Sequence, residues 1–284
     1  MKKLLLQLDT DRHPSAFDRI VALDAGADDV LSYGGVTPVD VPALVHGALF
    51  TRGPAELART AVWVGGSDAA AAEALLAATL RTFFGPFRVS CMMDANGCNT
   101  TAAAAVARLA GATALPGRRA VVLAGTGPVG LRAAALLARE GAQVALTSRA
   151  AARARAAAEE LRARFGVEVT PVEAGDDAGV ARALDGAAVC LAAGAAGTRL
   201  LPRSAWARHP TLLAMADVNA VPPLGIEGIE AADKGTAREG KAVFGALGVG
   251  SLKMRLHRAC VARLFERNDH VIDLEAIYAL ARAS

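Results

Sequence analysis

A glycine-rich loop near the middle of the chain is the segment best suited to bind a phosphate group. Residues 125–130 follow the pattern G-x-G-x-x-G directly after the apolar run Ala120–Ala124. In a strand–loop–helix unit the first glycine allows a tight turn, the second admits a pyrophosphate and the third lets the helix pack on the strand. The free N–H groups and the dipole of that helix attract the anion. Against the alternative of an ordinary turn, we predict a dinucleotide site at Gly125, Thr126, Gly127, Pro128, Val129 and Gly130.

The end of the next predicted strand indicates which dinucleotide is bound. A site for NAD usually carries an acid here that bonds the ribose hydroxyls. This sequence instead reads Leu146-Thr147-Ser148-Arg149, and Arg153 follows one helical turn later. Arginine and serine side chains can bind a 2′-phosphate that an acid would repel. We therefore predict NADP as the cofactor; the alternative is that these arginines are solvated surface side chains.

The sequence lacks the residue patterns of several dehydrogenase classes, which limits the kinds of hydride transfer that it can catalyse. The only tyrosines, Tyr33 and Tyr278, do not precede a lysine by four positions, as short-chain dehydrogenases require. The histidines and cysteines lack zinc-ligand spacing, so we expect no metal. Oxidation of an alcohol requires a base for the hydroxyl proton. The shortage of such bases favours a substrate that loses a hydride without a proton, such as a methylene carbon between two nitrogens.

The composition is that of a globular protein. The chain has 284 residues, 53% hydrophobic and 21% charged, with a formal net charge of +3. At roughly 100–200 residues per domain, two domains are expected. The balanced charge argues against a nucleic-acid partner, and no apolar run reaches the roughly 18 residues that a membrane helix needs. With four cysteines and no C-x-x-C pair, we expect a cytoplasmic protein with reduced thiols.

Alternating strand-like and helix-like segments predict an α/β protein. In the first half we expect strands at 4–8, 28–33, 61–64 and 88–93, and helices at 15–25, 39–50, 67–83 and 97–111. After a turn-forming break at 115–119 we expect strands at 120–124, 143–147, 168–172, 188–191 and 211–216, and helices at 128–140 and 150–164. Residues 220–250 are predicted to be irregular, and two helices at 251–266 and 273–282 close the chain.

Four stretches together resemble the bacterial NADP-dependent methylene-tetrahydromethanopterin dehydrogenases of methylotrophs. They include F-G-P-F-R-V-S-C-M-M-D at 84–94 with the polar residues up to 101, V-V-L-A-G-T-G-P-V-G at 121–130, A-D-V-N-A with P-P-L-G-I at 216–226, and G-A-L-G-V-G with L-K at 245–253. The resemblance runs from Leu4 to about Tyr278. It implies reversible hydride transfer between the methylene carbon of a reduced pterin and C4 of the nicotinamide, giving the methenyl cation.

The resemblance also implies two α/β domains with an interdomain cleft for the pterin. Residues 1–112 with about 251–284 would form the pterin-binding domain. Residues 113–250 would form an NADP-binding Rossmann domain with a doubly wound parallel sheet. A homo-oligomer such as a trimer or a hexamer, and acceptance of methylene-tetrahydrofolate, are further implications.

Several polar residues are candidates for contacts with the substrate. By resemblance, Phe17, Asp18 and Lys253 lie at the pterin, although Asp18 also suits a helix N-terminus and Lys253 a solvated helix face. Asp94 ends a strand, where α/β sites gather, but it also suits an Asx-turn. The residues that follow it can either cap the next helix or bond the ligands: Asn96, Asn99, Thr100 and Thr101.

Two further segments are candidates for contacts with the cofactor. Asp217 and Asn219 follow the strand 211–216 and can bond the nicotinamide carboxamide, unless they only form the turn before Pro222. Gly194 and Gly197 follow the strand 188–191 and allow close approach of the cofactor, or are simple turn glycines.

The sequence is also compatible with functions other than methylene-tetrahydromethanopterin dehydrogenation. One is a methylene-tetrahydrofolate dehydrogenase without cyclohydrolase activity, since the chain lacks the Tyr-x-x-x-Lys pair which that hydrolysis uses. Another is a non-catalytic NADP-binding sensor, which would need only the glycine loop. A glutamyl- or shikimate-type dehydrogenase is the most distant alternative.

Overall fold

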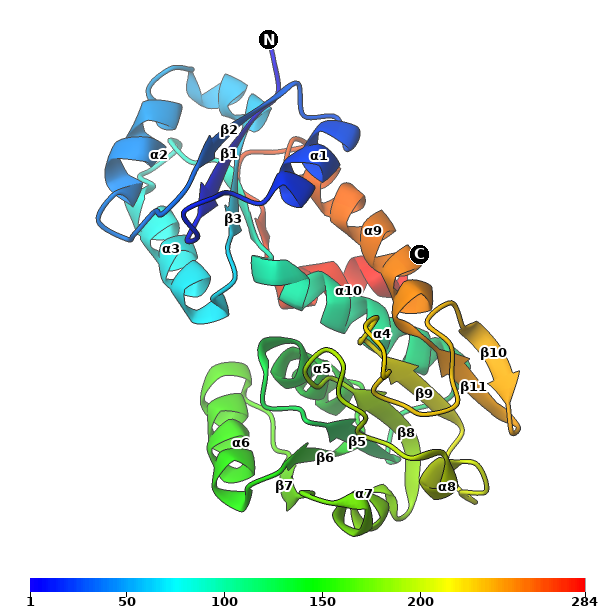
Figure 1. Ribbon diagram of the computed structural model, residues 1–284. Coiled ribbons are helices and arrows are strands. Elements are labelled where there is room, and N and C mark those ends of the chain that lie inside the picture. Colours follow the sequence, from blue (N-terminus) through cyan, green and yellow to red (C-terminus); the bar gives the residue numbers. More distant parts are fainter. Residues whose placement is uncertain (284) are drawn as a thin grey trace. The chain divides into compact units, whose positions relative to one another are not determined.

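The computed structural model describes residues 1–283 and divides into two compact α/β units (Figure 1). Unit 1 comprises Met1–Thr100 and Met254–Leu280, and unit 2 comprises Thr101–Lys253 and the residues from Ala281 onward. The three boundaries fall inside helices, namely α4 (Cys98–Ala112), α9 (Ala246–Arg263) and α10 (Leu274–Arg282). The expected functional division, after residues 112 and 250, stays a prediction.

Unit 1 contains a five-stranded sheet in the order β12-β4-β3-β1-β2, in which every neighbouring pair is parallel. After β1 the chain adds β2 on one side of it and β3 on the other, so the strand order reverses between β1 and β3. In open parallel sheets, ligands bind at the carboxyl ends of the strands beside such a reversal. The strands are β1 (Leu4–Asp9), β2 (Asp29–Tyr33), β3 (Thr60–Gly65), β4 (Ser90–Met93) and β12 (Val271–Ile272). The helices are α1 (Ala16–Asp24), α2 (Val41–Leu49), α3 (Ala69–Thr82) and α10 (Leu274–Arg282), with 3-10 turns η1 (Pro54–Arg59) and η2 (Ala95–Gly97).

Local sequence explains these elements. All six residues of β3, T-A-V-W-V-G, are buried, as expected for a central strand of a parallel sheet covered on both faces. The Ser15 hydroxyl accepts a hydrogen bond from the Asp18 N–H (3.2 Å) and so begins α1. The Asp68 carboxylate accepts from two N–H groups of the first turn of α3. The predicted strands and helices of this half are therefore confirmed to within a few residues.

Unit 2 contains a seven-stranded sheet in the order β10-β11-β9-β8-β5-β6-β7. From β7 to β11 the strands follow the 3-2-1-4-5-6 order of a Rossmann sheet, which confirms the predicted fold class. The strands are β5 (Arg119–Leu123), β6 (Gln143–Ser148), β7 (Thr170–Glu173), β8 (Ala187–Ala192), β9 (Ala214–Asp217), β10 (Lys234–Arg238) and β11 (Lys241–Phe244). The helices are α5 (Pro128–Arg139), α6 (Ala151–Phe165), α7 (Asp177–Leu184) and α8 (Arg203–Trp206).

The prediction that residues 220–250 are irregular is wrong for their second half. Strands β10 and β11 form an antiparallel hairpin, so the sheet is not wholly parallel, and α9 begins at Ala246 rather than at Ser251. Glu239 (φ 48°) and Gly240 (φ 74°) form the hairpin turn, and positive φ at both central residues is typical of a type I′ turn. The Arg238 guanidinium donates to both oxygens of Asp233 (2.6 and 2.8 Å), which ties the hairpin to the preceding loop.

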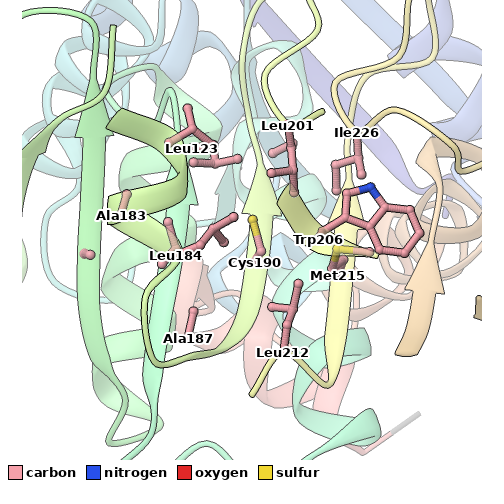
Figure 2. Packing of buried hydrophobic residues seen from close by; sticks show 14 of the residues in the cluster. Leu123, Ala183, Leu184, Ala187, Cys190, Leu201, Trp206, Leu212, Met215 and Ile226 are labelled. Atoms are coloured by element: carbon pink, nitrogen blue, oxygen red, sulfur yellow. The ribbon is translucent and has the colours of Figure 1, made fainter. Parts of the chain in front are cut away.

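One face of the second sheet is covered by the short helices α7 and α8. Figure 2 shows Ala183 and Leu184 of α7 packed against the sheet, and the Trp206 ring lying beside Met215 and Ile226. The Trp206 indole N–H donates to the carbonyl oxygen of Glu227 (2.8 Å), so this buried ring has a partner for its polar atom. The packing fixes the loops after β8 and β9 on the sheet. Within residues 1–283, no helix is long and apolar enough to cross a bilayer.

Candidate functional site

The glycine loop lies at the carboxyl end of β5, beside the point where the strand order of unit 2 reverses between β5 and β8. A Cβ at Gly130 would lie 2.6 Å from the Gly125 Cα, so the third glycine allows α5 to pack against the loop. A Cβ at Gly127 would meet nothing within 4 Å, so the backbone here is open to an approaching group. Gly127 is also the N-cap of α5, and the N–H groups at a helix N-terminus, which have no partners within the helix, are suited to bind an anion. The loop therefore has the geometry of a pyrophosphate site.

A pocket of about 120 Å³ opens beside this loop, at the carboxyl ends of β5, β6 and β7. Its lining includes Ala124 just before the glycine loop, Ser148 and Arg149 from the end of β6, and Gly175 and Val180 from the β7–α7 segment. The position and lining suit the adenosine half of a dinucleotide whose pyrophosphate lies on the glycine loop.

The three residues predicted to bind the 2′-phosphate occupy different positions. Ser148 is buried in the pocket wall, and Arg149 lines the pocket with an exposed side chain. Arg153 is exposed on α6 and is not part of the pocket lining in the described chain. Of the two arginines, Arg149 is therefore the one that lines the pocket, and the contacts of Arg149 and Arg153 with a 2′-phosphate stay predictions.

Sequence reasoning missed a second arginine of this pocket. Arg199, from the loop after β8, lines the pocket and pairs with Asp177 (3.2 Å) and Glu227 (3.5 Å). Another lining acid, Asp176, is used as the N-cap of α7 and accepts from the Gly179 N–H (2.7 Å). No motif marks Arg199, because it stands in an irregular loop and its ionic partners come from other segments.

The structure gives Asp217 and Asn219 partners inside their own loop. Asp217 is fully buried and its oxygens accept from the N–H groups of Asn219 and Ile226 (both 2.9 Å). The Asn219 side chain donates to the Pro223 carbonyl (3.1 Å) and accepts from the Val221 N–H (2.9 Å). These contacts fit the turn-forming alternative, and the predicted bond to the nicotinamide stays a prediction.

Burial of Asp217 has a consequence for the pH dependence of stability. Burial raises the pKa of this carboxyl above 3.8, although hydrogen bonds from Asn219, Ile226 and Gly225 oppose the shift. The folded state then binds the proton more tightly than the unfolded state, so the contribution of this group falls as pH rises above about 4. The quantity to compare is the difference in unfolding free energy between the parent protein and Asp217→Asn. We expect this difference to decrease as the pH rises from about 4 to neutrality. Urea titrations check this, with the exposed Asp185→Asn as control; a pH-independent difference would contradict it.

The two glycines after β8 have separate roles. A Cβ at Gly194 would lie 2.7 Å from Leu200 Cδ1 and 3.3 Å from Ala124 Cβ, so this glycine lets the loop pack against the first residue before the glycine loop. Gly197 has a φ of 71° and turns the chain. The predicted contact of Gly194 with the cofactor remains untested.

In unit 1, Asp94 organises the start of α4. Its Oδ1 accepts from the N–H groups of Asn99 (2.8 Å) and Thr100 (3.0 Å), and its Oδ2 accepts from the Thr100 hydroxyl (2.5 Å). The Asn99 side chain donates to the Met93 carbonyl (2.7 Å). All three residues are buried, whereas Asn96 is exposed with a φ of 49°. The capping alternative therefore describes Asp94, Asn99 and Thr100, and among the four candidates that follow Asp94 only Asn96 is fully on the exposed side.

Removing the Asp94 carboxylate should destabilise the protein. Asp94→Ala leaves two buried N–H groups without their acceptor and removes the shorter hydrogen bond of the Thr100 hydroxyl, so we expect a loss of about 2 kcal/mol in unfolding free energy. The matched control is Asp68→Ala at the exposed N-cap of α3, with an expected loss of about 1 kcal/mol. Urea unfolding of both variants measures the difference, and equal losses would contradict the assigned role.

A second group of polar atoms gathers at the carboxyl ends of β1 and β3. Asp18 on α1 is a near neighbour of His257 on α9, with Oδ1 3.9 Å from His257 Nε2. The His257 ring stacks flat on Trp63 (centroids 4.5 Å apart, planes 1° apart) and contacts Phe17, which is half exposed. Lys253 stands one helical turn before His257 in α9 and is partly buried.

Trp63 and His257 were not among the predicted site residues. Trp63 stands within an apolar strand, where a tryptophan is expected to be a core residue. Nothing in the sequence around His257 indicates that this residue, from a distant part of the chain, contacts Trp63. No cluster of metal-ligating side chains is present within residues 1–283.

Comparisons with known proteins bear on the whole chain. Residues 16–96 match a family model described as methylene-tetrahydromethanopterin dehydrogenase, N-terminal. The chain is 54% identical over 283 residues to the bifunctional protein MdtA of Methylorubrum extorquens, covering 99% of this chain and 98% of that protein. It is 34% identical over 290 residues to an NAD(P)-dependent methylenetetrahydromethanopterin dehydrogenase of the same organism, with the same coverage of both chains.

Solved structures with low sequence identity share the fold. A 5-ketofructose reductase of Gluconobacter is 15% identical with a TM-score of 0.51, covering 100% of this chain and 99% of that one. A shikimate 5-dehydrogenase of Mycobacterium fortuitum is 18% identical with a TM-score of 0.50, covering 98% and 97%. These likenesses show the fold of the two units.

Proposed function

Because the chain belongs to the methylene-tetrahydromethanopterin dehydrogenase family, as its motifs predicted, we propose that it transfers a hydride reversibly from methylene-tetrahydromethanopterin to NADP⁺. The product is methenyl-tetrahydromethanopterin, and the reaction belongs to the oxidation of formaldehyde-derived one-carbon units. The observation that carries the proposal is the alignment of nearly the whole chain with a relative named for this dehydrogenation.

The residues at the carboxyl edge of the second sheet fit a nicotinamide dinucleotide. Gly127 leaves open space at the N-terminus of α5, where the backbone N–H groups would hold the pyrophosphate. Arg149 and Ser148 at the end of β6 would hold the 2′-phosphate, and no acid stands at that strand end to favour a free ribose hydroxyl. When bound, the cofactor supplies the carbon that accepts the hydride.

The reaction requires that the substrate be aligned with the cofactor, and it requires no side chain that accepts a proton. The C–H bond of the methylene carbon breaks with its electron pair, and the two flanking nitrogens stabilise the cation that remains. The side chains therefore act mainly by binding and orientation. Asp18 offers a carboxylate to the N–H groups of the pterin, Phe17 an apolar ring, and Lys253 a cation.

Lys253 is expected to affect binding more than chemistry. Because no proton is transferred, Lys253→Ala should raise the KM for the pterin by about tenfold, while kcat changes by less than about threefold. Steady-state kinetics at saturating NADP⁺ measure both constants. A large fall in kcat with an unchanged KM would instead assign this lysine a part in the chemical step.

An assay of four substrate combinations tests the function directly. The purified protein is incubated with NADP⁺ or NAD⁺ and either methylene-tetrahydromethanopterin or methylene-tetrahydrofolate, and reduction of the nicotinamide is followed by absorbance. The proposal expects the fastest turnover with NADP⁺ and the methanopterin. Faster turnover of the folate would favour that alternative, and tight NADP⁺ binding without any turnover would favour a sensor. The cytoplasmic location and the homo-oligomer stay predictions.

A further inference from the structure

Arg199 lines the pocket beside the glycine loop, and the proposed function gives it no role. It belongs to the segment 193–202 between β8 and α8, whereas most of the other lining residues stand at the carboxyl ends of β5, β6 and β7. The chain directly after Arg199 is fixed, because the N–H groups of Leu200 and Leu201 both donate to the Gly225 carbonyl oxygen (2.8 and 2.9 Å). The fold therefore sets the position of Arg199 at the pocket.

Two acids hold the side chain of Arg199. Its Nη2 lies 3.2 Å from Asp177 Oδ2, and its Nη1 lies 3.5 Å from Glu227 Oε2. Asp177 is the first residue of α7 and also lines the pocket. The Arg199 side chain keeps 41% of its surface exposed, and both acids are more exposed still, so these ion pairs add little to stability. Their effect is to fix where the guanidinium lies.

The order of the strands indicates which part of a dinucleotide Arg199 meets. Along the sheet, β5 is followed by β6 and then by β7. With the pyrophosphate on the glycine loop after β5 and the ribose at the end of β6, the base extends towards β7 and the start of α7. Asp177, which holds Arg199, stands at that end of the pocket.

The charges around Arg199 favour the base over a phosphate as its ligand. Asp177 and Glu227 already offset the positive charge of the guanidinium, and their carboxylates would repel another anion. Ion pairing through the edge of a guanidinium leaves its planar faces available, and such planes stack on aromatic rings. An arginine paired with two acids is thus better suited to cover a flat base than to bind a phosphate.

We propose that Arg199 binds the adenine of NADP by stacking its guanidinium plane on the base, an inference that rests on the proposed function. Val180 and Leu200, which also line the pocket, supply apolar contacts to the same base. Because the guanidinium is held by its two acids before the cofactor binds, little side-chain freedom is lost on binding. On this assignment Arg149 responds to the 2′-phosphate, whereas Arg199 binds NADP and NAD alike.

Two substitutions and a matched control test the assignment. Arg199→Ala removes the guanidinium, and Arg199→Lys keeps the positive charge without the plane. The control is Arg203→Ala, which removes an exposed arginine that is paired with Glu239 and does not line the pocket. For each protein the Kd values of NADPH and NADH are measured by nicotinamide fluorescence and that of 2′,5′-ADP by calorimetry. Urea unfolding of each variant verifies that it is folded, and if Arg199→Ala is not, Arg199→Lys alone decides.

We expect Arg199→Ala and Arg199→Lys to raise the Kd values of all three nucleotides by about tenfold, as the loss of a stacked guanidinium predicts. Arg203→Ala should change none of them by more than about twofold. Unchanged Kd values in Arg199→Ala would overturn the proposal. Parent affinity in Arg199→Lys would also overturn it, because charge alone would then suffice. So would a loss confined to NADPH and 2′,5′-ADP, since Arg199 would then bind the 2′-phosphate.

These binding data separate the inference from the proposed function, because the binding of 2′,5′-ADP requires neither a pterin nor turnover. If the parent protein turns over methylene-tetrahydromethanopterin with NADP⁺ while the Arg199 variants bind all three nucleotides as the parent does, only the inference fails. If the parent turns over no methylene-pterin while Arg199→Ala and Arg199→Lys bind all three nucleotides more weakly, the proposed function fails and the assignment of Arg199 stands.

Discussion

Arg149→Asp should lower kcat/KM for NADP⁺ by about 100-fold while leaving kcat/KM for NAD⁺ unchanged or slightly higher. Arg149 lines the pocket beside the glycine loop, at the strand end where NAD-binding sheets usually carry an acid. The variant removes charge-assisted hydrogen bonds to the 2′-phosphate and adds repulsion, together about 3 kcal/mol. The acid can also accept a hydrogen bond from a free 2′-hydroxyl, which favours NAD⁺.

Steady-state kinetics with both cofactors measure this change in preference. The control is Arg155→Asp, which makes the same change in charge at an exposed position of α6. Because Arg155 does not line the pocket, we expect an effect of less than about threefold. Equal losses in the two variants would mean that the charge of the whole protein, and not Arg149, sets the affinity for NADP⁺.

The second large effect concerns two glycines of the same loop. Replacing Gly130 by alanine should lower the stability of the protein, whereas replacing Gly127 by alanine should weaken the binding of NADPH. A Cβ at Gly130 would lie 2.6 Å from the Gly125 Cα, so Gly130→Ala must separate α5 from the loop. We expect a loss of about 3 kcal/mol in unfolding free energy. A Cβ at Gly127 meets nothing within 4 Å, and its φ of −85° suits alanine, so Gly127→Ala should fold with a loss below about 1 kcal/mol.

The same Gly127→Ala variant should nevertheless bind NADPH about 30-fold more weakly, because its methyl group stands where the pyrophosphate approaches the backbone. Urea unfolding gives the stabilities and fluorescence titration gives the NADPH Kd. A Gly130→Ala protein as stable as the parent, or a Gly127→Ala protein that binds NADPH normally, would contradict the roles assigned to these glycines.

Much of the fold follows from local sequence signals. The unit from β5 to β6 was predictable to within a residue or two, because an apolar strand, a glycine loop and an amphipathic helix follow one another with Pro128 at the first turn. The β10–β11 hairpin was not, because its strands are short and Glu239 is not a usual residue for a turn position with positive φ. Helix α7 was also missed, since its eight residues stand within a polar stretch and include Gly179.

Some residues of the candidate site can likewise be found from local sequence, and others only from the structure. The glycine loop and Arg149 stand out in the sequence because the residues of a phosphate site of this kind follow one another in the chain, and the structure places Arg149 in the pocket beside the loop. Asp94 and Asp217 were identified as notable acids, but their hydrogen bonds go to their own loops, which spacing alone does not reveal. Trp63, His257 and Arg199 could not be predicted, because each acquires its neighbours only when distant segments meet in the folded chain.

One isotope-transfer measurement tests the central claim most directly. The protein is incubated with NADP⁺ and methylene-tetrahydromethanopterin whose methylene carbon carries deuterium in place of hydrogen, and the reduced nucleotide is analysed by mass spectrometry. Hydride transfer from that carbon predicts NADPH that contains deuterium, formed together with the methenyl product. Formation of NADPH without deuterium, or absence of NADPH formation at saturating concentrations of both substrates, would contradict the account.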